Sequence, residues 1–351
     1  MLLLFRERPR GGTTFALASV AERTGQPQTA TRRFDPHTEE AMTELNQRTL
    51  KSKVTCSGVG LHSGARVAMT LRPAPVGSGI TFVRTDLTPA VEIAARAAHV
   101  VDTRFATTLG RAGARVATVE HLLSALSGLG LDNVRIELDG PEVPIMDGSA
   151  APFVYLLRTA GIELQRKLKR FLVVRKTLEV RDGDKRAQMA PASQFGISCT
   201  IDFDHPLIKD QELRITLSDQ TYARDIARAR TFALLRDVEG LQRIGLARGG
   251  SLANAIVVDD FNILNPEGLR FADEFVRHKV LDIVGDLALC GMPVIGHFTS
   301  YKSGHALNHK LVQLLCEQSD AVEIVEVREQ KQLERLARLP AAFGLPEGQI
   351  A

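Results

Sequence analysis

The sequence predicts an α+β fold made of two similar halves. In each half, several strand signals precede a helix signal with a histidine, a glycine stop and one more strand. With 351 residues, 44% of them hydrophobic, the chain is long enough to bury more than one core. We therefore expect two similar α/β layers that face one another, with a functional site at their junction.

The first half begins with three strand signals. Apolar runs bounded by turn residues predict strands over residues 65–74, 79–86 and 90–100. The run "TVEHLLSALSGLG" (118–130) predicts a helix, because its leucines and alanine recur at the i, i+3, i+4, i+7 spacing. A strand over 133–140 and a helix within 144–161 complete this half.

The second half repeats the pattern without repeating the residues. Strands are predicted over residues 170–183, 186–192 and 195–206. A helix over 274–291, a strand and loop over 293–304 and a closing helix over 305–318 follow. We expect a linker in "GIELQRKLKRF" (161–171) as the boundary between the halves.

These boundaries predict a domain plan. Residues 1–45 lack sustained periodicity and are rich in Arg, Thr, Gly and Pro, which is typical of a disordered extension. We expect domain I over 46–168, domain II over 169–320 and a polar C-terminal tail over 321–351.

Composition excludes several classes of protein. The 44 basic and 41 acidic side chains nearly balance, with no basic stripe, so nucleic acid is not an expected partner. The four cysteines form no CxxC pair, which indicates a reducing compartment. The sequence has no run of 18 apolar residues, so no transmembrane helix is expected. We expect a cytoplasmic protein.

The helix "EFVRHKVLDIVGDL" (274–287) carries an unusual polar face. His278, Asp282 and Asp286 are spaced four apart, so they lie on one side of an otherwise apolar helix. A catalytic zinc takes three protein ligands and keeps one position open, and His278 with Asp282 supplies two of them. His121, next to Glu120, is the best candidate for the third. An HxxxD pair is also common by chance, and a lone histidine is often an ordinary core residue.

Seven motifs carry a resemblance that is more specific than this pattern. They are "SGVGLHSG", "TVEHLLSALSGLGLDN", "VPIMDGSA", "RARTFALLRD", "GGSLANAIVVDD", "DEFVRHKVLDIVGDL" and "YKSGHALNHK". Together, in this order from about Gln47 to about residue 317, they resemble the UDP-3-O-acyl-N-acetylglucosamine deacetylase family. That family consists of zinc amidases that commit Gram-negative bacteria to lipid A biosynthesis.

The resemblance implies a role for each matching residue. It places the zinc ligands on His121, His278 and Asp282, the general base on Glu120, and the general acid on His305. The remaining matches are Thr231 for the oxyanion, Asp286 and Lys279 as polar residues close to the metal, Phe232 for contact with the sugar and His62 for the substrate site. The nucleophile would be a water molecule activated by the metal, and acetate would be released.

The resemblance also implies the fold and the partners. Two similar two-layer domains would sandwich helices between sheets, each domain with an insert, and the second insert, about 233–259, would form the passage for the acyl chain. The substrate would be UDP-3-O-acyl-N-acetylglucosamine, and a monomer is expected. Zinc is the expected cofactor, although iron(II) fits the same ligands. Two alternatives remain: an inactive binding protein with structural zinc, and a hydrolase of another N-acyl sugar.

Overall fold

The structure, a computed structural model, describes residues 45–328. The predicted extension before residue 45 and the predicted tail beyond residue 328 lie outside the described residues. The helices are α1 (Glu120–Gly128), α2 (Ala151–Ala160), α3 (Asp219–Thr221), α4 (Leu235–Arg243), α5 (Glu274–Leu287) and α6 (His305–Glu317). Short 3-10 or π turns form η1 (Ala97–His99), η2 (Tyr222–Ile226) and η3 (Ala288–Cys290).

Three sheets of the described chain come from its first half. The largest has the strand order β2-β3-β9-β4-β5 and consists of β2 (Val54–Val59), β3 (Arg66–Pro73), β4 (Ile80–Arg84), β5 (Val91–Ala94) and β9 (Val134–Leu138). A smaller antiparallel sheet contains β6 (Val100–Asp102), β7 (Thr108–Arg111) and β8 (Ala114–Val116). The third is an antiparallel pair of β1 (Asn46–Leu50) and β10 (Ile162–Leu168).

The second half forms a larger sheet. Its main path is β12-β13-β18-β11-β19, with β14 paired to β18 and β15 paired to β14. These strands are β11 (Arg170–Val174), β12 (Leu178–Asp182), β13 (Lys185–Ala190), β14 (Phe195–Ile201), β15 (Gln211–Thr216), β18 (Val294–Tyr301) and β19 (Val322–Glu326). A separate parallel pair contains β16 (Phe232–Leu234) and β17 (Ile256–Val258).

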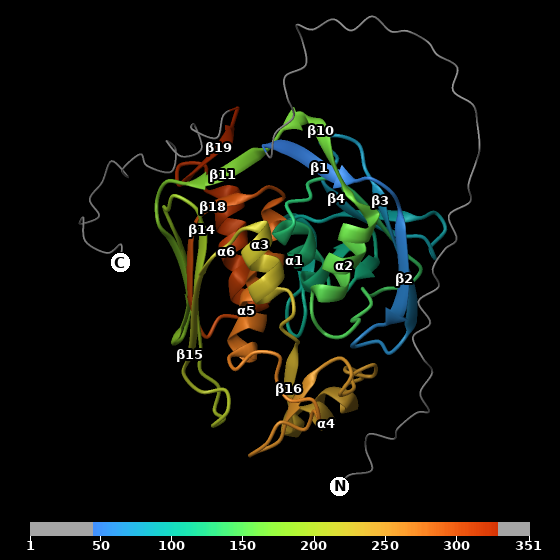
Figure 1. Ribbon diagram of the computed structural model, residues 1–351, viewed down its shortest axis with the longest axis vertical. Coiled ribbons are helices and arrows are strands. Elements are labelled where there is room, and N and C mark those ends of the chain that lie inside the picture. Colours follow the sequence, from blue (N-terminus) through green and yellow to red (C-terminus); the bar gives the residue numbers. More distant parts are fainter. Residues whose placement is uncertain (1–44, 329–351) are drawn as a thin grey trace, which may run out of the picture. The chain divides into compact units, whose positions relative to one another are not determined.

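Helices lie between the two large sheets. Figure 1 shows α1, α5 and α6 in the middle of the molecule, with the β14–β18 sheet on one side and β2, β3 and β4 on the other. The α+β prediction is therefore confirmed. No helix within residues 45–328 has the length and apolar character needed to cross a membrane.

Each sheet of the described chain takes its strands from one side of residue 169, whereas residues 45–328 together form one compact unit. We keep the division into domains at 46–168 and 169–320 as a proposal. β19 lies in the region predicted as a tail, and its antiparallel pairing with β11 extends the second sheet.

Three local predictions differ from the structure. The strand expected over 170–183 is divided into β11 and β12, which are not neighbours in the sheet. The expected linker over 161–171 is mostly strand β10, because its backbone pairs with β1 at the start of the described chain. The strand expected over 90–100 is broken into β5, η1 and β6. The run "AARAA" in its middle has no β-branched or aromatic residue, so it has little preference for an extended strand.

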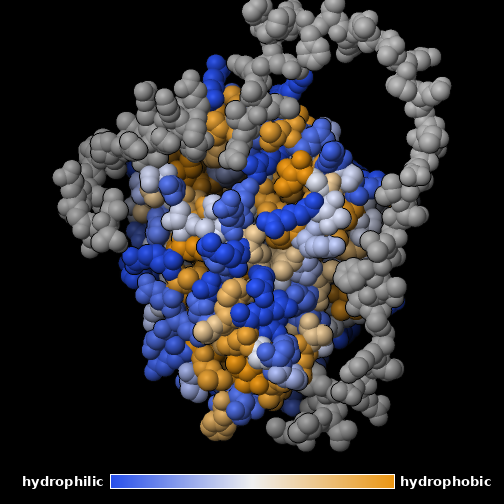
Figure 2. All heavy atoms as spheres, in the orientation of Figure 1, coloured by the Kyte–Doolittle hydropathy of each residue, from blue (hydrophilic) through white to orange (hydrophobic). Residues whose placement is uncertain are grey.

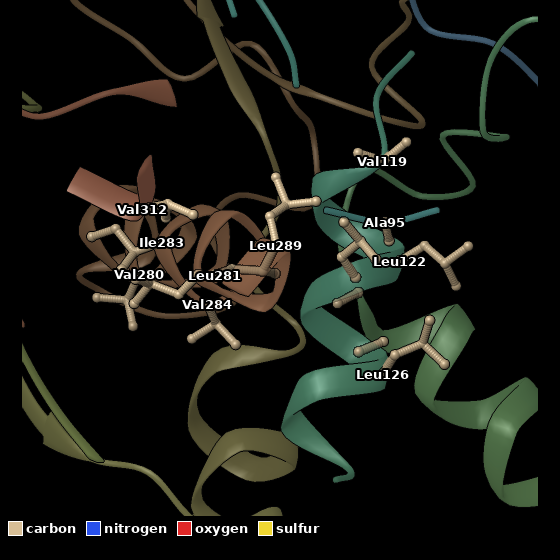
Figure 3. Packing of buried hydrophobic residues seen from close by; sticks show 14 of the residues in the cluster. Ala95, Val119, Leu122, Leu126, Val280, Leu281, Ile283, Val284, Leu289 and Val312 are labelled. Carbon is tan, nitrogen blue, oxygen red and sulfur yellow. The ribbon is translucent and has the colours of Figure 1, made fainter. Parts of the chain in front are cut away.

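The contact between α1 and α5 forms the centre of the core. Nearly all of α5 is buried, which explains why its sequence is apolar on most sides. Figure 3 shows α1 next to α5, with Leu122 and Leu126 among the buried side chains of α1 and Leu281 and Val284 among those of α5. Gly285 permits this approach, since a Cβ atom there would lie 2.1 Å from the carbonyl oxygen of Glu120.

We expect Gly285→Ala to lower the free energy of unfolding by about 1–3 kcal/mol, because the added methyl group forces α1 and α5 apart. Urea denaturation measures this change. Gly240→Ala in α4 is the matched control, since a Cβ there has no neighbour within 4 Å. That change should be neutral or stabilise by up to about 1 kcal/mol. Equal loss of stability in both variants would contradict the proposed close contact.

Candidate active site

Three buried side chains from α1 and α5 converge at the centre of the helix layer. Nε2 of His121 lies 3.7 Å from Oδ1 of Asp282, and Nε2 of His278 lies 3.4 Å from the same oxygen. One ligand atom from each residue lies within 4.8 Å of the others. The i, i+4 pair on α5 and the histidine predicted from α1 are therefore brought together.

These atoms fit a divalent cation. For a tetrahedral ion with bonds of 2.0–2.1 Å, neighbouring ligand atoms lie about 3.3 Å apart, close to the separations from both imidazoles to Asp282. Oδ1 of Asp282 is buried and has no hydrogen-bond partner in the part of the chain that the structure describes. An unsatisfied carboxylate oxygen between two imidazoles is costly without an ion. The residues thus fit a divalent metal ion.

The protonation states also suit metal binding. Burial, together with the neighbouring His278, lowers the pKa of His121 to about 3. Burial also lowers the pKa of His278. Burial opposes ionisation of Asp282, but the adjacent Lys279 and the imidazoles hold its pKa well below the usual range. Two neutral imidazoles and one carboxylate are the forms that bind metals.

Two neighbours orient the ligands on α5. Nδ1 of His278 donates to the carbonyl oxygen of Ala229 at 3.1 Å, which leaves Nε2 facing the centre. Arg230 is only 2% exposed, and its Nε donates to Glu274 at the start of α5 at 2.9 Å. This buried ion pair fixes the segment that carries Ala229. Nζ of Lys279 donates to Oδ2 of Asp282 at 2.8 Å, whereas Oδ1, the oxygen between the two imidazoles, accepts no hydrogen bond within residues 45–328.

A second group of side chains borders the ligands. Nε2 of His305, at the start of α6, lies 3.7 Å from Oε1 of Glu120 and 4.0 Å from Oδ2 of Asp282. On the other side of its ring, Nδ1 lies 2.9 Å from Oδ2 of Asp286. Nδ2 of Asn308 donates to the same Asp286 oxygen at 2.9 Å. Glu120 and His305 therefore face each other across the edge of the ligand cluster.

Burial and neighbouring charges shift the pKa values of Glu120 and His305 away from those of exposed residues. Burial raises the pKa of Glu120 to about 7, although the charge of His305 opposes the rise. Burial would lower the pKa of His305, but Asp286 overcomes this effect and raises it to about 10. A carboxyl group that titrates near neutrality beside a cationic imidazole is an arrangement suited to proton transfer.

The remaining predicted residues differ in how closely they contact the cluster. The ring of Phe232 is 6.3 Å from the ring of His278, and Nζ of Lys279 is 5.7 Å from the Phe232 ring centre. Within residues 45–328, no hydrogen bond or ion pair joins the side chain of Thr231 or His62 to the cluster. The backbone N–H of Thr231 donates to Gly148, and that of His62 donates to Glu142. Their substrate roles stay predictions.

Sequence reasoning missed three groups that support the site. Asn308 lies three residues after His305 on the same helix, and this i, i+3 spacing was a usable signal. The carbonyl of Ala229 gave no signal, because a backbone group is independent of side-chain identity. Thr107 donates to Asp286 at 2.6 Å from a strand-rich segment far from α5 in sequence, so no local pattern could reveal it.

Comparison with known proteins is consistent with this geometry. The UDP-3-O-acyl N-acetylglycosamine deacetylase family model matches residues 47–317. A UDP-3-O-acyl-N-acetylglucosamine deacetylase of Myxococcus xanthus is 62% identical over 283 residues, which cover 81% of this chain and 90% of that protein. The enzyme of the same name from Anaeromyxobacter sp. strain Fw109-5 is 56% identical over 306 residues, covering 87% and 99%. The chain therefore belongs to the UDP-3-O-acyl N-acetylglycosamine deacetylase family, whose members hydrolyse an amide.

Proposed function

We propose that the protein is a zinc-dependent enzyme that removes the N-acetyl group of UDP-3-O-(3-hydroxyacyl)-N-acetylglucosamine and releases acetate. This reaction would be the committed step of lipid A biosynthesis. The observation that carries the proposal is the buried cluster of His121, His278 and Asp282 with Glu120 and His305 at its edge. In a chain of this family, that arrangement combines a metal-binding set with two proton-transfer groups.

Each side chain at the site would have its own role in the hydrolysis. When bound, the metal would polarise the amide carbonyl and make water more acidic. Glu120 takes the proton from the attacking water, since it is adjacent to His121 and its Oε1 lies 3.7 Å from Nε2 of His305 at the edge of the cluster. His305 gives a proton from Nε2 to the departing amine, and Asp286 behind it stabilises the cationic ring. Thr231 would add a donor to the oxyanion, an interaction worth about 3 kcal/mol in comparable sites.

The substrate would be held by residues around this centre. Phe232 would contact the sugar, Lys279 would bind the substrate through its diphosphate, and His62 would line the substrate site. The insert over 233–259 would take the acyl chain. Figure 2 shows apolar surface gathered over the region of β16 and α4, and the apolar residues of α4 are only half-buried, so this surface suits a lipid chain. Each buried CH₂ group would contribute about 0.8 kcal/mol.

A direct assay tests the proposal. Acetate release is measured on UDP-3-O-acyl-N-acetylglucosamine substrates of several acyl lengths, before and after chelation, and after zinc or iron(II) is restored. We expect chelation to abolish turnover and zinc to recover it, because three ligands without an ion leave the amide unpolarised. Full turnover in the chelated protein would contradict metal dependence. A metal-loaded protein that binds these substrates without releasing acetate would contradict the proposed activity.

A further inference from the structure

Thr107 is a buried residue that contacts both proton-transfer groups. It lies just before β7 and is 1% exposed. Its backbone N–H donates to Oε2 of Glu120 at 3.1 Å, and its hydroxyl donates to Oδ1 of Asp286 at 2.6 Å. Glu120 belongs to α1 and Asp286 to α5, so one residue from the first half holds a carboxylate on each of two helices.

The hydroxyl proton of Thr107 fixes the direction of the neighbouring hydrogen bonds. A threonine hydroxyl has one proton, and this proton is given to Asp286. Nδ1 of His305 lies 3.3 Å from the same hydroxyl oxygen, so in this contact the oxygen is the acceptor and Nδ1 carries a hydrogen. Asp286, which accepts at 2.9 Å from Nδ1, requires the same assignment.

This assignment determines which His305 nitrogen can work. With a hydrogen on Nδ1 in either charge state, Nε2 alone can gain or lose a proton. Nε2 is the atom that faces Glu120 and Asp282, at 3.7 and 4.0 Å. The nitrogen of His305 that can exchange a proton therefore faces the cluster of His121, His278 and Asp282.

Asp286 is held from two sides. Thr107 donates to Oδ1, while Asn308 donates to Oδ2 at 2.9 Å. Asn308 lies on the same helix as His305 and moves with it, whereas Thr107 comes from another part of the fold. The threonine is therefore the contact that sets the carboxylate of Asp286 relative to Glu120.

We propose that Thr107 is a positioning residue for the hydrolysis: it orients Asp286, and through it the Nδ1–H form of His305, while its backbone holds Glu120. This inference rests on the proposed function. It assigns to Thr107 no contact with the substrate and no proton transfer of its own.

The test compares Thr107→Val with Thr107→Ser. Valine keeps the shape and the backbone N–H but removes the hydroxyl, whereas serine keeps the hydroxyl. We expect Thr107→Val to lower kcat about 10–100-fold, typical for the loss of an outer hydrogen-bond partner. The KM, the bound metal and the circular dichroism spectrum should stay close to the parent values. Thr107→Ser should recover most of kcat. Thr108→Val, at the first position of β7, is the matched control and should leave kcat unchanged.

A second readout does not depend on turnover. In protein with ¹⁵N-labelled histidine, NMR should show that Nδ1 of His305 carries a hydrogen in the parent. In Thr107→Val, the ring should no longer be held in this one protonation form. Parental kcat in Thr107→Val, or a folded, metal-loaded Thr107→Ser as slow as the valine variant, would overturn the inference. Unchanged histidine signals in Thr107→Val would also overturn it. If the parent releases no acetate, the proposed function fails, and the NMR comparison still tests the positioning.

Discussion

Replacing Glu120 by glutamine is expected to lower kcat by about 10²–10⁴-fold, the usual contribution of a general base. A glutamine carbonyl can still accept the hydrogen bond that Oε2 receives from the backbone of Thr107, so the side chain should keep its place. It has no carboxylate to take a proton from water. Glu120 is outside the ligand cluster, and the bound metal should therefore be unchanged. Steady-state kinetics and metal analysis of the same preparation measure both quantities.

Glu137→Gln is the control for this change. Glu137 lies on β9 and pairs with Arg72 at 2.7 Å at the surface, away from the helix layer. Its replacement should leave kcat within about twofold, because Glu137 is not part of the cluster and the ion pair is partly exposed and weak. Parental kcat in Glu120→Gln would exclude the assignment of the general base. Loss of metal in that variant would instead mean that Glu120 is a ligand.

Replacing His278 by alanine is expected to remove both the metal and the activity. The two remaining ligands, His121 and Asp282, would hold an ion by one imidazole and one carboxylate, fewer than a catalytic site uses. The loss of metal affinity should exceed the 10–100-fold that is typical when only a hydrogen-bond partner of a ligand is lost. Elemental analysis after dialysis should show about one zinc per chain in the parent and almost none in the variant.

His297→Ala is the matched histidine control. His297 lies on β18, where its Nε2 is 2.9 Å from the hydroxyl of Ser198, and it is not part of the cluster. Metal content and turnover should stay at the parent level. A His278→Ala protein that binds a full equivalent of zinc and remains active would rule out the proposed ligand set.

Much of the site follows from short-range sequence patterns. The spacing of His278, Asp282 and Asp286 predicts one polar helix face, and in the structure all three residues lie on α5 and are buried. The helix around Glu120 and His121 is also predicted by its leucine spacing and observed as α1. In both cases the periodicity of a helix converts sequence distance directly into spatial position.

Other features depend on partners that a local pattern does not specify. β10 looks like a polar linker in sequence, yet β1 pairs with it over nearly its full length. Thr107 resembles any threonine in a strand-rich region until α5 brings Asp286 to its hydroxyl. Such contacts arise from tertiary structure, where strand pairing and buried hydrogen bonds outweigh intrinsic preference. A resemblance that covers whole motifs predicts the reacting residues but not these supporting contacts.

The proposed ligands are divided between α1, in the first half of the chain, and α5, in the second half. Neither half synthesised alone can therefore coordinate an ion with three side chains. Contacts between distant parts of a sequence form late and slowly during folding. Zinc uptake during refolding would consequently show when the two halves have packed against each other. Chelation would weaken the contact between the halves as well as the hydrolysis.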